Sequence, residues 1–523
     1  MRCPVAASTP IANNNVAHEC RLSWAAGFGS NCAAPGLVWA PVPLMRLGSA
    51  VELMGPLDAV MMTAEVLSNP LHVAALIILA PPGDAGPGYV EQLYRDGLEG
   101  ADMLDPRLRR HPHRGLDTGG IWVWREAKDI DLGQQVQRRT LPPGAGRDAL
   151  WRLVGELHAE PLDRSRPMWM SCLIDGLQDG RFAYYMKVHH TVVDGVAGFQ
   201  MIEDALSPDP HRRSMRPFFA PVPDSATDRT AAPGRLWNPI PLVRSVVGAA
   251  AGSAGVVRRV AAGEVSNLVG SLITKTTVLP FDAPYTRFNG RLGLERTFTA
   301  GSWSKDRIRA VQNAAGVTAN DVLTAVVAGV LREWLIAHDE LPEKSLVAIC
   351  PVTVRGREHA PGHGDADEPA NLFGAELCPL GTDLAEPAER LALIHRAMSW
   401  AKQQVASRGS GATMLLLAPS IAPTVLLPML RFAPKLRTGY NLPISNVPGP
   451  KHQLYWNGAH VEEIYPVSAI YDGMALNVTV CSYADRFGFG YVAGRDVLPD
   501  IETLVPLTER CLAELETAVG VAP

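Results

Sequence analysis

The chain has 523 residues, of which 47% are hydrophobic and 19% are charged. This composition is typical of a globular protein with a large core, and the length suits two domains or one bilobal unit. A formal net charge of −5 gives no reason to expect nucleic acid as a partner. The eight cysteines form no Cys-x-x-Cys pair and do not cluster with histidine at zinc spacing. We therefore expect reduced thiols and no bound metal.

Residues 1–48 are rich in Pro, Ala, Asn and Gly, and they lack the basic start and apolar run of a secretory signal. We expect a disordered N-terminal extension there. The first folded half is expected over residues 49–210. Its periodicity predicts strands over 71–79 and 121–124 and helices over 89–97 and 148–158, the last with Asp148 as N-cap.

A run of aromatic and β-branched residues over 182–188 predicts a strand that leads directly into His189 and His190. Side chains alternate along a strand, so these two histidines point in opposite directions and cannot hold one metal together. His190 continues the more apolar face. Beyond Gly195, apolar residues recur every three or four positions, which predicts a helix with Asp194 at its start.

His190 is a candidate general base, because an imidazole with an unperturbed pKa of ~6.5 can take a proton from an alcohol near neutral pH. The alternative is a buried structural histidine beside an Asp that only caps a helix. The Asp194-Gly195 pair that begins four residues after His190 makes the pattern more selective than an isolated pair of histidines.

Residues 211–285 begin with a Pro/Arg-rich crossing linker and continue into an Ala/Val/Gly-rich helical stretch over 242–277. This stretch either lies on a lipid surface or packs between the halves. The second half is expected over 286–518. Within it, 411–430 carries no charge but three prolines, which favours a surface-dipping or channel segment over a membrane span. Other patterns predict helices over 303–316, 320–337 and 506–519, a strand over 345–353 and a hairpin over 476–492.

The order His189-His190-x-x-x-Asp194-Gly195 resembles the signature of the CoA-dependent acyltransferase superfamily. Further motifs are similar to those of one of its families, the bacterial wax ester synthase/diacylglycerol acyltransferases, and they follow the family order. They are Pro56-Leu57-Asp58-Ala59, Pro161-Leu162 to Pro167-Met168-Trp169, Asn320-Asp321, Ser445-Asn446-Val447-Pro448-Gly449-Pro450 and Tyr465-Pro466-Val467-Ser468. Met168 departs from the pattern, since the family usually has Leu there.

The resemblance implies an α/β (α+β) fold of two chloramphenicol-acetyltransferase-like lobes, with the active site in a tunnel between them. It implies that His190 acts as general base within a catalytic motif that includes His189, Asp194 and Gly195, and that Asp194 holds the turn in shape. It also places Asn320 and Asp321 near the active centre, where an amide orients substrate or stabilises an oxyanion. The residues alone leave another interpretation, in which Asn320 only caps a helix.

The same resemblance predicts transfer of a long-chain acyl group from acyl-CoA to diacylglycerol, which gives triacylglycerol and CoA, with wax ester synthesis as a side activity. Acyl-CoA is then a co-substrate, and no cofactor is expected. The alternatives are acyl transfer to another lipid alcohol and a non-catalytic surface protein of lipid bodies. We expect a cytoplasmic location, or a peripheral one at the inner membrane or on lipid inclusions.

Overall fold

The computed structural model describes residues 51–67, 69–193, 195–220, 278, 282–353, 373–408 and 439–522. The extension expected at 1–48, most of the linker expected at 211–285 and the uncharged stretch at 411–430 lie outside the described residues. The described residues build a mixed α/β fold with two six-stranded sheets and one three-stranded sheet.

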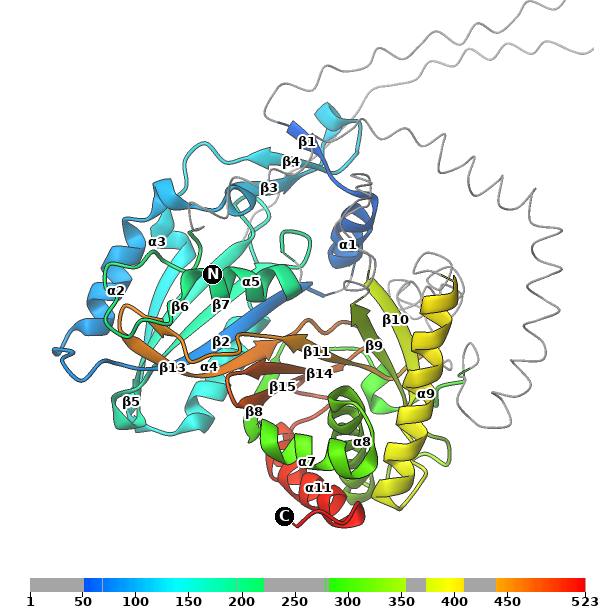
Figure 1. The fold of residues 1–523 in the computed structure, drawn as a ribbon. Coiled ribbons are helices and arrows are strands. Elements are labelled where there is room, and N and C mark those ends of the chain that lie inside the picture. Colours follow the sequence, from blue (N-terminus) through cyan, green and yellow to red (C-terminus); the bar gives the residue numbers. More distant parts are fainter. Residues whose placement is uncertain are drawn as a thin grey trace, which may run out of the picture. The chain divides into compact units, whose positions relative to one another are not determined.

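The first six-stranded sheet has the strand order β12-β13-β2-β7-β6-β5 (Figure 1). Its strands are β2 (His72–Ala80), β5 (Val136–Ala145), β6 (Trp169–Leu177), β7 (Phe182–His189), β12 (Tyr455–Trp456) and β13 (Ala459–Val467). β7 lies inside the sheet, antiparallel to both β2 and β6, and nearly all of its residues are buried. The sheet therefore fixes the end of β7, where the two histidines lie.

The second six-stranded sheet has the order β10-β9-β11-β14-β15-β8. Its strands are β8 (Arg296–Ser304), β9 (Val347–Thr353), β10 (Phe373–Pro379), β11 (Leu442–Pro448), β14 (Leu476–Tyr483) and β15 (Arg486–Gly494). β14 and β15 pair in antiparallel register, so the hairpin predicted at 476–492 is confirmed. A small sheet, β1 (Val51–Leu53), β4 (Val123–Glu126) and β3 (Arg110–His113), completes the strands.

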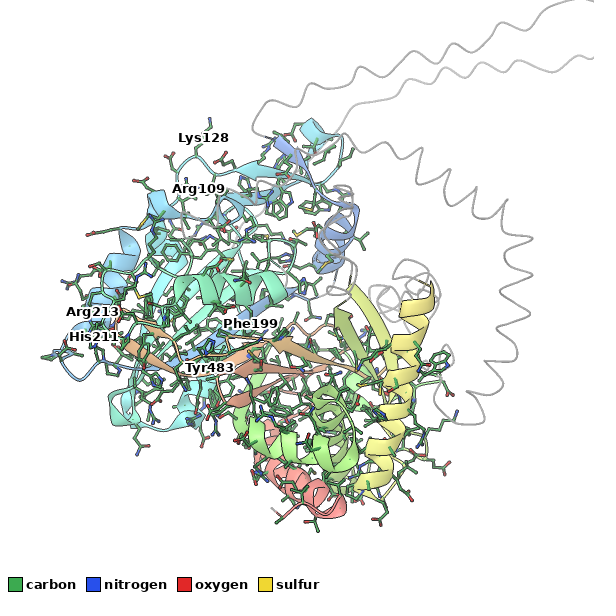
Figure 2. The ribbon with its side chains drawn as sticks, viewed as in Figure 1. Arg109, Lys128, Phe199, His211, Arg213 and Tyr483 are labelled. Atoms are coloured by element: carbon green, nitrogen blue, oxygen red, sulfur yellow. The ribbon has the colours of Figure 1, made fainter. Side chains whose placement is uncertain are left out.

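The helices cover the sheets. In chain order they are α1 (Pro56–Leu67), α2 (Tyr89–Leu98), α3 (Leu132–Gln135), α4 (Arg147–Ala159), α5 (Gly195–Ala205), α7 (Lys305–Ala315), α8 (Ala319–Ala337), α9 (Pro387–Arg408) and α11 (Leu504–Ala518). Figure 1 shows α7, α8, α9 and α11 grouped against the second sheet, and their buried residues form one apolar cluster with it. Figure 2 labels Phe199 of α5 and Tyr483 of β14, which belong to another apolar cluster, shared by both halves.

β13 ties the two sheets together. It comes from the second half of the chain, yet it pairs along β2 of the first sheet, from His460 opposite Ala80 to Val467 opposite Ala74. It also passes close to β15, where a Cβ added to Gly490 would lie 1.9 Å from the carbonyl oxygen of Pro466. Only a residue without a Cβ allows the two backbones to approach this closely.

The helix predicted from residue 506 begins two residues earlier, at Leu504, and two other predicted helix starts were wrong for reasons that the structure shows. The helix expected to begin with Asp148 as its N-cap has Gly146 there, and Asp148 lies in the first turn, where a carboxylate suits the positive end of the helix dipole. The helix expected from residue 303 begins at Lys305, because Trp303 belongs to β8 and pairs with Phe487 of β15. Tertiary pairing thus extended a strand that local periodicity did not reveal.

Among the residues that the structure describes, we find no single helix long and apolar enough to cross a membrane. α7 and α8 pass that test only together, and they are bent by 102° at their junction. Most of α8 is buried in the core of the second half, and a core helix has the same apolar composition as a span.

Candidate active site

The end of β7 is held between two neighbouring segments. The backbone N–H of His189 donates to the carbonyl of Met168 at 2.9 Å, and the N–H of His190 donates to the carbonyl of Leu71 at 3.0 Å. β7 ends at His189, and His190 begins a turn in which the N–H of Val192 donates to the carbonyl of His189 at 2.9 Å. The side chain of His189 is fully buried away from the cavity described below, whereas that of His190 lines it. The alternation expected for the two histidines is therefore what the structure has.

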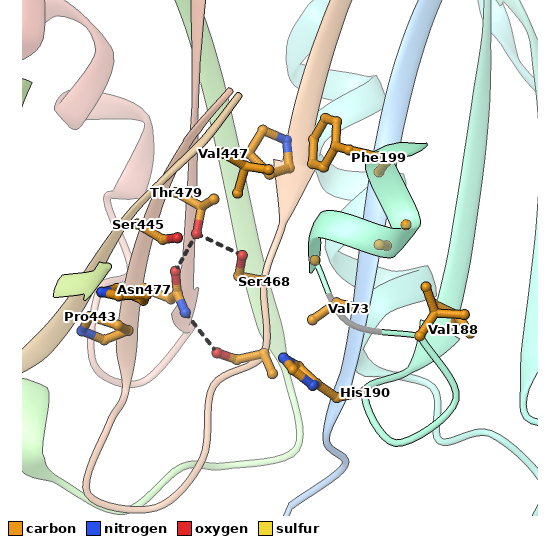
Figure 3. A pocket seen from close by; sticks show the side chains of 18 of the residues that line it. Val73, Val188, His190, Phe199, Pro443, Ser445, Val447, Ser468, Asn477 and Thr479 are labelled. Carbon is orange, nitrogen blue, oxygen red and sulfur yellow. Dashed lines mark hydrogen bonds between the residues drawn. The ribbon is translucent and has the colours of Figure 1, made fainter. Parts of the chain in front are cut away.

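A cavity of about 500 Å³ lies against the face of His190. This volume is within the usual range for the binding site of a small organic ligand. The first half of the chain contributes His190 and an otherwise apolar lining, which includes Met186. Figure 3 shows Val73, Val188 and Phe199 of this lining. An imidazole on such a lining can exchange a proton with a bound hydroxyl.

The second half lines the opposite side of the cavity and supplies its other polar side chains, which we call the polar wall. The polar wall consists of Tyr440, Ser445, Asn446, Ser468, Tyr471, Asn477 and Thr479. Figure 3 shows Ser445, Ser468, Asn477 and Thr479 gathered across the cavity from His190. The cavity therefore has one apolar side with a single imidazole and one side rich in hydroxyl and amide groups.

His189 does not line this cavity. Its side chain is fully buried, and Nε2 donates to the carboxylate of Glu65 while Nδ1 lies 2.7 Å from the hydroxyl of Thr191. Glu65 also lies 3.5 Å from the guanidinium of Arg164. The ring of His189 thus links α1 to the turn after β7, which makes it a positioning residue for the turn that carries His190.

The remaining motif residues flank the turn. Gly195 begins α5 and lines the cavity, whereas Asp194 lies outside the described residues. Arg166, which precedes the motif in the chain, is paired with Asp163 at 3.2 Å. The predicted structural role of Asp194 stays a prediction.

The structure does not place Asn320 or Asp321 among the cavity residues. Both lie in the first turn of α8, whose N-cap is Thr318 and not Asn320. Asp321 closes a capping box with Thr318 and accepts a hydrogen bond from Nδ1 of His395 at 2.8 Å. Asp321 therefore organises the start of a core helix, because the unpaired N–H groups at a helix N-terminus need acceptors, whereas the amide of Asn320 contacts the sulfur of Met398 at 3.5 Å.

Sequence reasoning missed Asn477 and Thr479. A signal was present, because residues 476–481 alternate between Leu, Val and Val on one face and Asn, Thr and Cys on the other. Strict alternation predicts a strand with one distinctive face. It does not reveal that this face looks onto the cavity of His190, since that depends on how the two sheets meet.

Behind the cavity lies a buried layer of neutral histidines. Nε2 of His158 donates to the carbonyl of Ser468 at 3.2 Å, so its Nδ1 accepts from the hydroxyl of Tyr185 at 3.0 Å. Burial and the nearby charge of Lys187 lower the pKa of His158 to about 3. Burial likewise lowers the pKa of His72 well below its ordinary value. These rings brace β7 and the polar wall without carrying charge.

Within the described ranges, no group of three or more His, Cys, Asp or Glu side chains is arranged to hold a metal ion. The five described cysteines are free and buried, namely Cys172, Cys350, Cys378, Cys481 and Cys511. Burial raises the pKa of Cys172 to about 12, so its thiol is protonated and unreactive. The polar side chains that line the cavity, among the described residues, are one imidazole, hydroxyls and amides.

Comparison with known proteins agrees with this geometry. Residues 54–323 match the wax ester synthase/diacylglycerol acyltransferase catalytic domain, and residues 370–516 match the C-terminal domain of the same family. A relative from Mycobacterium tuberculosis, described as a candidate diacylglycerol O-acyltransferase, is 38% identical over 475 residues, which cover 89% of this chain and 100% of the relative. A second such relative from that organism is 36% identical over 489 residues, 93% of this chain and 94% of the relative.

Solved structures give the same result. The wax ester synthase/diacylglycerol acyltransferase of Marinobacter aquaeolei VT8 is 33% identical, with a TM-score of 0.70 over 90% of this chain and 100% of that one. The first condensation domain of the CDA synthetase has a TM-score of 0.51 over 91% of this chain and 98% of its own, but only 16% identity, so it shows the fold alone. This fold consists of two chloramphenicol-acetyltransferase-like lobes, as expected. The chain belongs to the wax ester synthase/diacylglycerol acyltransferase family.

Proposed function

We propose that this protein is an acyl-CoA-dependent O-acyltransferase that transfers a long-chain acyl group to the free hydroxyl of diacylglycerol. One observation carries the proposal. Within the described residues, His190 is the one imidazole on the lining of a largely apolar cavity built by both halves of the chain. Such a cavity suits a fatty acyl chain, and the relatives from Mycobacterium tuberculosis carry the corresponding name.

The carbonyl of an acyl-CoA thioester is already activated, so transfer needs no covalent enzyme intermediate. The reaction requires a group that accepts the proton of the attacking hydroxyl. His190 takes that proton as the alcohol oxygen bonds to the carbonyl carbon, and it returns the proton to the departing thiolate of CoA. A positioned base of this kind contributes ~10²–10⁴-fold to the rate.

The apolar lining has a second effect. It holds the acyl chain and the lipid alcohol together and keeps water away from the thioester, which favours transfer over hydrolysis. A plain long-chain alcohol would fit the same lining, so wax ester formation is expected as a side activity. Acyl-CoA enters as co-substrate and leaves as free CoA.

The test is an assay of the purified full chain with radiolabelled palmitoyl-CoA and either diolein or hexadecanol. We expect labelled triacylglycerol from diolein, and a loss of ~10²–10⁴-fold in kcat for His190→Ala. His460→Ala is the matched control, since His460 lies on β13 outside the cavity and bonds the exposed Gln453. If His190→Ala turned over as fast as the wild type, His190 would not be the general base. If no long-chain alcohol gave a product, a lipid-binding protein would be favoured over an enzyme.

A further inference from the structure

The polar wall contains a chain of hydrogen bonds whose proton directions are all fixed by one backbone carbonyl. The side-chain amide of Asn477 lies 3.1 Å from the carbonyl oxygen of Ala469, between β13 and β14. A backbone carbonyl only accepts, so the amide must present its nitrogen to Ala469 and its oxygen Oδ1 away from it. The orientation of the Asn477 amide is thereby determined.

The donor and acceptor of each remaining hydrogen bond follow from that orientation. The hydroxyl of Thr479 lies 2.9 Å from Oδ1 of Asn477 and must donate to it, because Oδ1 has no proton. Thr479 then has only lone pairs left for Ser468, whose hydroxyl lies 2.7 Å away and donates to it. The direction runs from Ser468 to Thr479 to Asn477 to Ala469, and it leaves the amide no freedom to flip.

One donor remains unused. The amide nitrogen carries two hydrogens, and only the bond to Ala469 is made by it among the described residues. Asn477 is 8% exposed and lines the same cavity as His190, and its second N–H has no acceptor among the described residues. A buried N–H left without a partner is costly, so this N–H favours an acceptor oxygen of a molecule bound in the cavity.

We propose that the second N–H of Asn477 donates a hydrogen bond to the thioester carbonyl oxygen and stabilises the negative charge that develops on it during acyl transfer. The inference rests on the proposed function. As the alcohol oxygen bonds to the carbonyl carbon, the π pair moves onto the carbonyl oxygen, and His190 takes the hydroxyl proton. When the pair returns, the C–S bond breaks and the thiolate receives that proton. The amide holds the oxygen throughout and gains or loses no proton.

Asn477 thus has the role of oxyanion stabiliser that the family resemblance implied for Asn320. An amide locked by two neighbours is preorganised, and a donor aimed where charge develops contributes most to catalysis when it does not have to reorient. Thr479 and Ser468 act through Asn477 and are positioning residues. Neither is required to touch the substrate.

Asn477→Leu tests the donor, because Leu fills a similar volume without an N–H. We expect kcat with palmitoyl-CoA and diolein to fall by ~10²–10³-fold, as after loss of an oxyanion donor. The KM for palmitoyl-CoA should stay within about threefold, since the interaction forms in the transition state. Asn477→Asp keeps the shape but replaces the donor with a negative oxygen, so its kcat should fall at least as far.

The positioning role is tested with Thr479. Thr479→Val removes the hydroxyl that holds Oδ1 and should lower kcat by about tenfold, whereas Thr479→Ser keeps the hydroxyl and should restore it. Thr508→Val is the matched control, because Thr508 also donates from a buried hydroxyl but lies on α11 outside the cavity. If Asn477→Leu does not fold, the comparison of Thr479→Val with Thr479→Ser tests the inference in its place.

Three results would overturn the inference. In the first, kcat of Asn477→Leu is unchanged while His190→Ala is inactive. The proposed acyltransferase activity would then be retained, but Asn477 would not be an oxyanion donor. In the second, the loss appears only in KM, which makes Asn477 a ground-state binding or bracing residue. In the third, wild-type protein forms no ester from any alcohol, which removes the proposed function and this inference together.

Discussion

At the scale of single residues, the histidines of this protein show how burial decides their chemistry. His190 faces the cavity, His189 is locked to Glu65, and His158 and His72 are buried as neutral rings. Among the residues that the structure describes, the last two have no acidic partner that would favour their charged form. Their protonation therefore opposes folding.

This gives a prediction for pH. The pKa of His158 is about 3 in the folded protein, against 6.5 ordinarily, and His72 is shifted in the same direction. Between these values the unfolded chain binds protons that the folded chain does not. The free energy of unfolding is therefore highest, as far as these two histidines contribute to it, above about pH 6.5, and it decreases progressively as the pH falls toward 3.

Urea unfolding at a series of pH values between about 7 and 5 checks this sign. His158→Gln should flatten the dependence, because a glutamine can still donate to the carbonyl of Ser468 but does not titrate in this range. A pH dependence of equal steepness in the variant and the wild type would contradict the assignment to His158.

At the scale of elements, β13 and β15 cross so closely that the contact requires glycine in β15. A Cβ at Gly490 would lie 1.9 Å from the carbonyl oxygen of Pro466, and one at Gly488 would lie 2.5 Å from that of Ile464. In each case the obstacle is backbone and cannot turn aside. The glycines let the strand that carries the cavity residue Pro466 lie against the second sheet.

Gly490→Ala should therefore destabilise the protein by about 1–3 kcal/mol, the usual cost of overpacking, or more. The midpoint of thermal or urea unfolding measures this. Gly86→Ala is the control, because an added Cβ there meets nothing within 4 Å. Equal midpoints for Gly490→Ala and the wild type would show that β13 and β15 can separate at little cost.

At the scale of the whole molecule, the two halves of the chain share their cores. The first sheet is completed by β12 and β13 of the second half, and apolar clusters include buried residues of both, such as Ile77 with Ile464. The cavity likewise needs both, since His190 comes from one half and Asn477 from the other.

A fragment of residues 49–210 should therefore fail to fold alone, because β2 would become an open edge and its apolar face would lack a partner. Co-expression with a fragment of residues 282–523 should recover a soluble complex. Circular dichroism and gel filtration of each fragment and of the pair check this. A monomeric 49–210 fragment with cooperative unfolding would contradict it.

The elements that local pattern predicts well are those with a long, regular apolar period. The helix predicted at 320–337 is α8, whose apolar positions such as Val322, Val326 and Val330 pack into the core. The strand predicted at 71–79 is β2. The strand β8 was missed, because it is recognised by its pairing with β15 far along the chain and not by its own composition.

The sequence by itself determined the family and the strand–turn–helix that carries His189 and His190, because motif order and side-chain alternation are local properties of the chain. It could not tell which of Asn320 and Asn477, both amides in apolar surroundings, lies at the cavity of His190. Tertiary structure decided that: α8 turns Asn320 into the helix layer, whereas the meeting of β13, β14 and β7 brings Asn477 to the cavity of His190. The physical reason is that a catalytic cavity is formed by residues distant in sequence, whose proximity depends on how whole sheets pack.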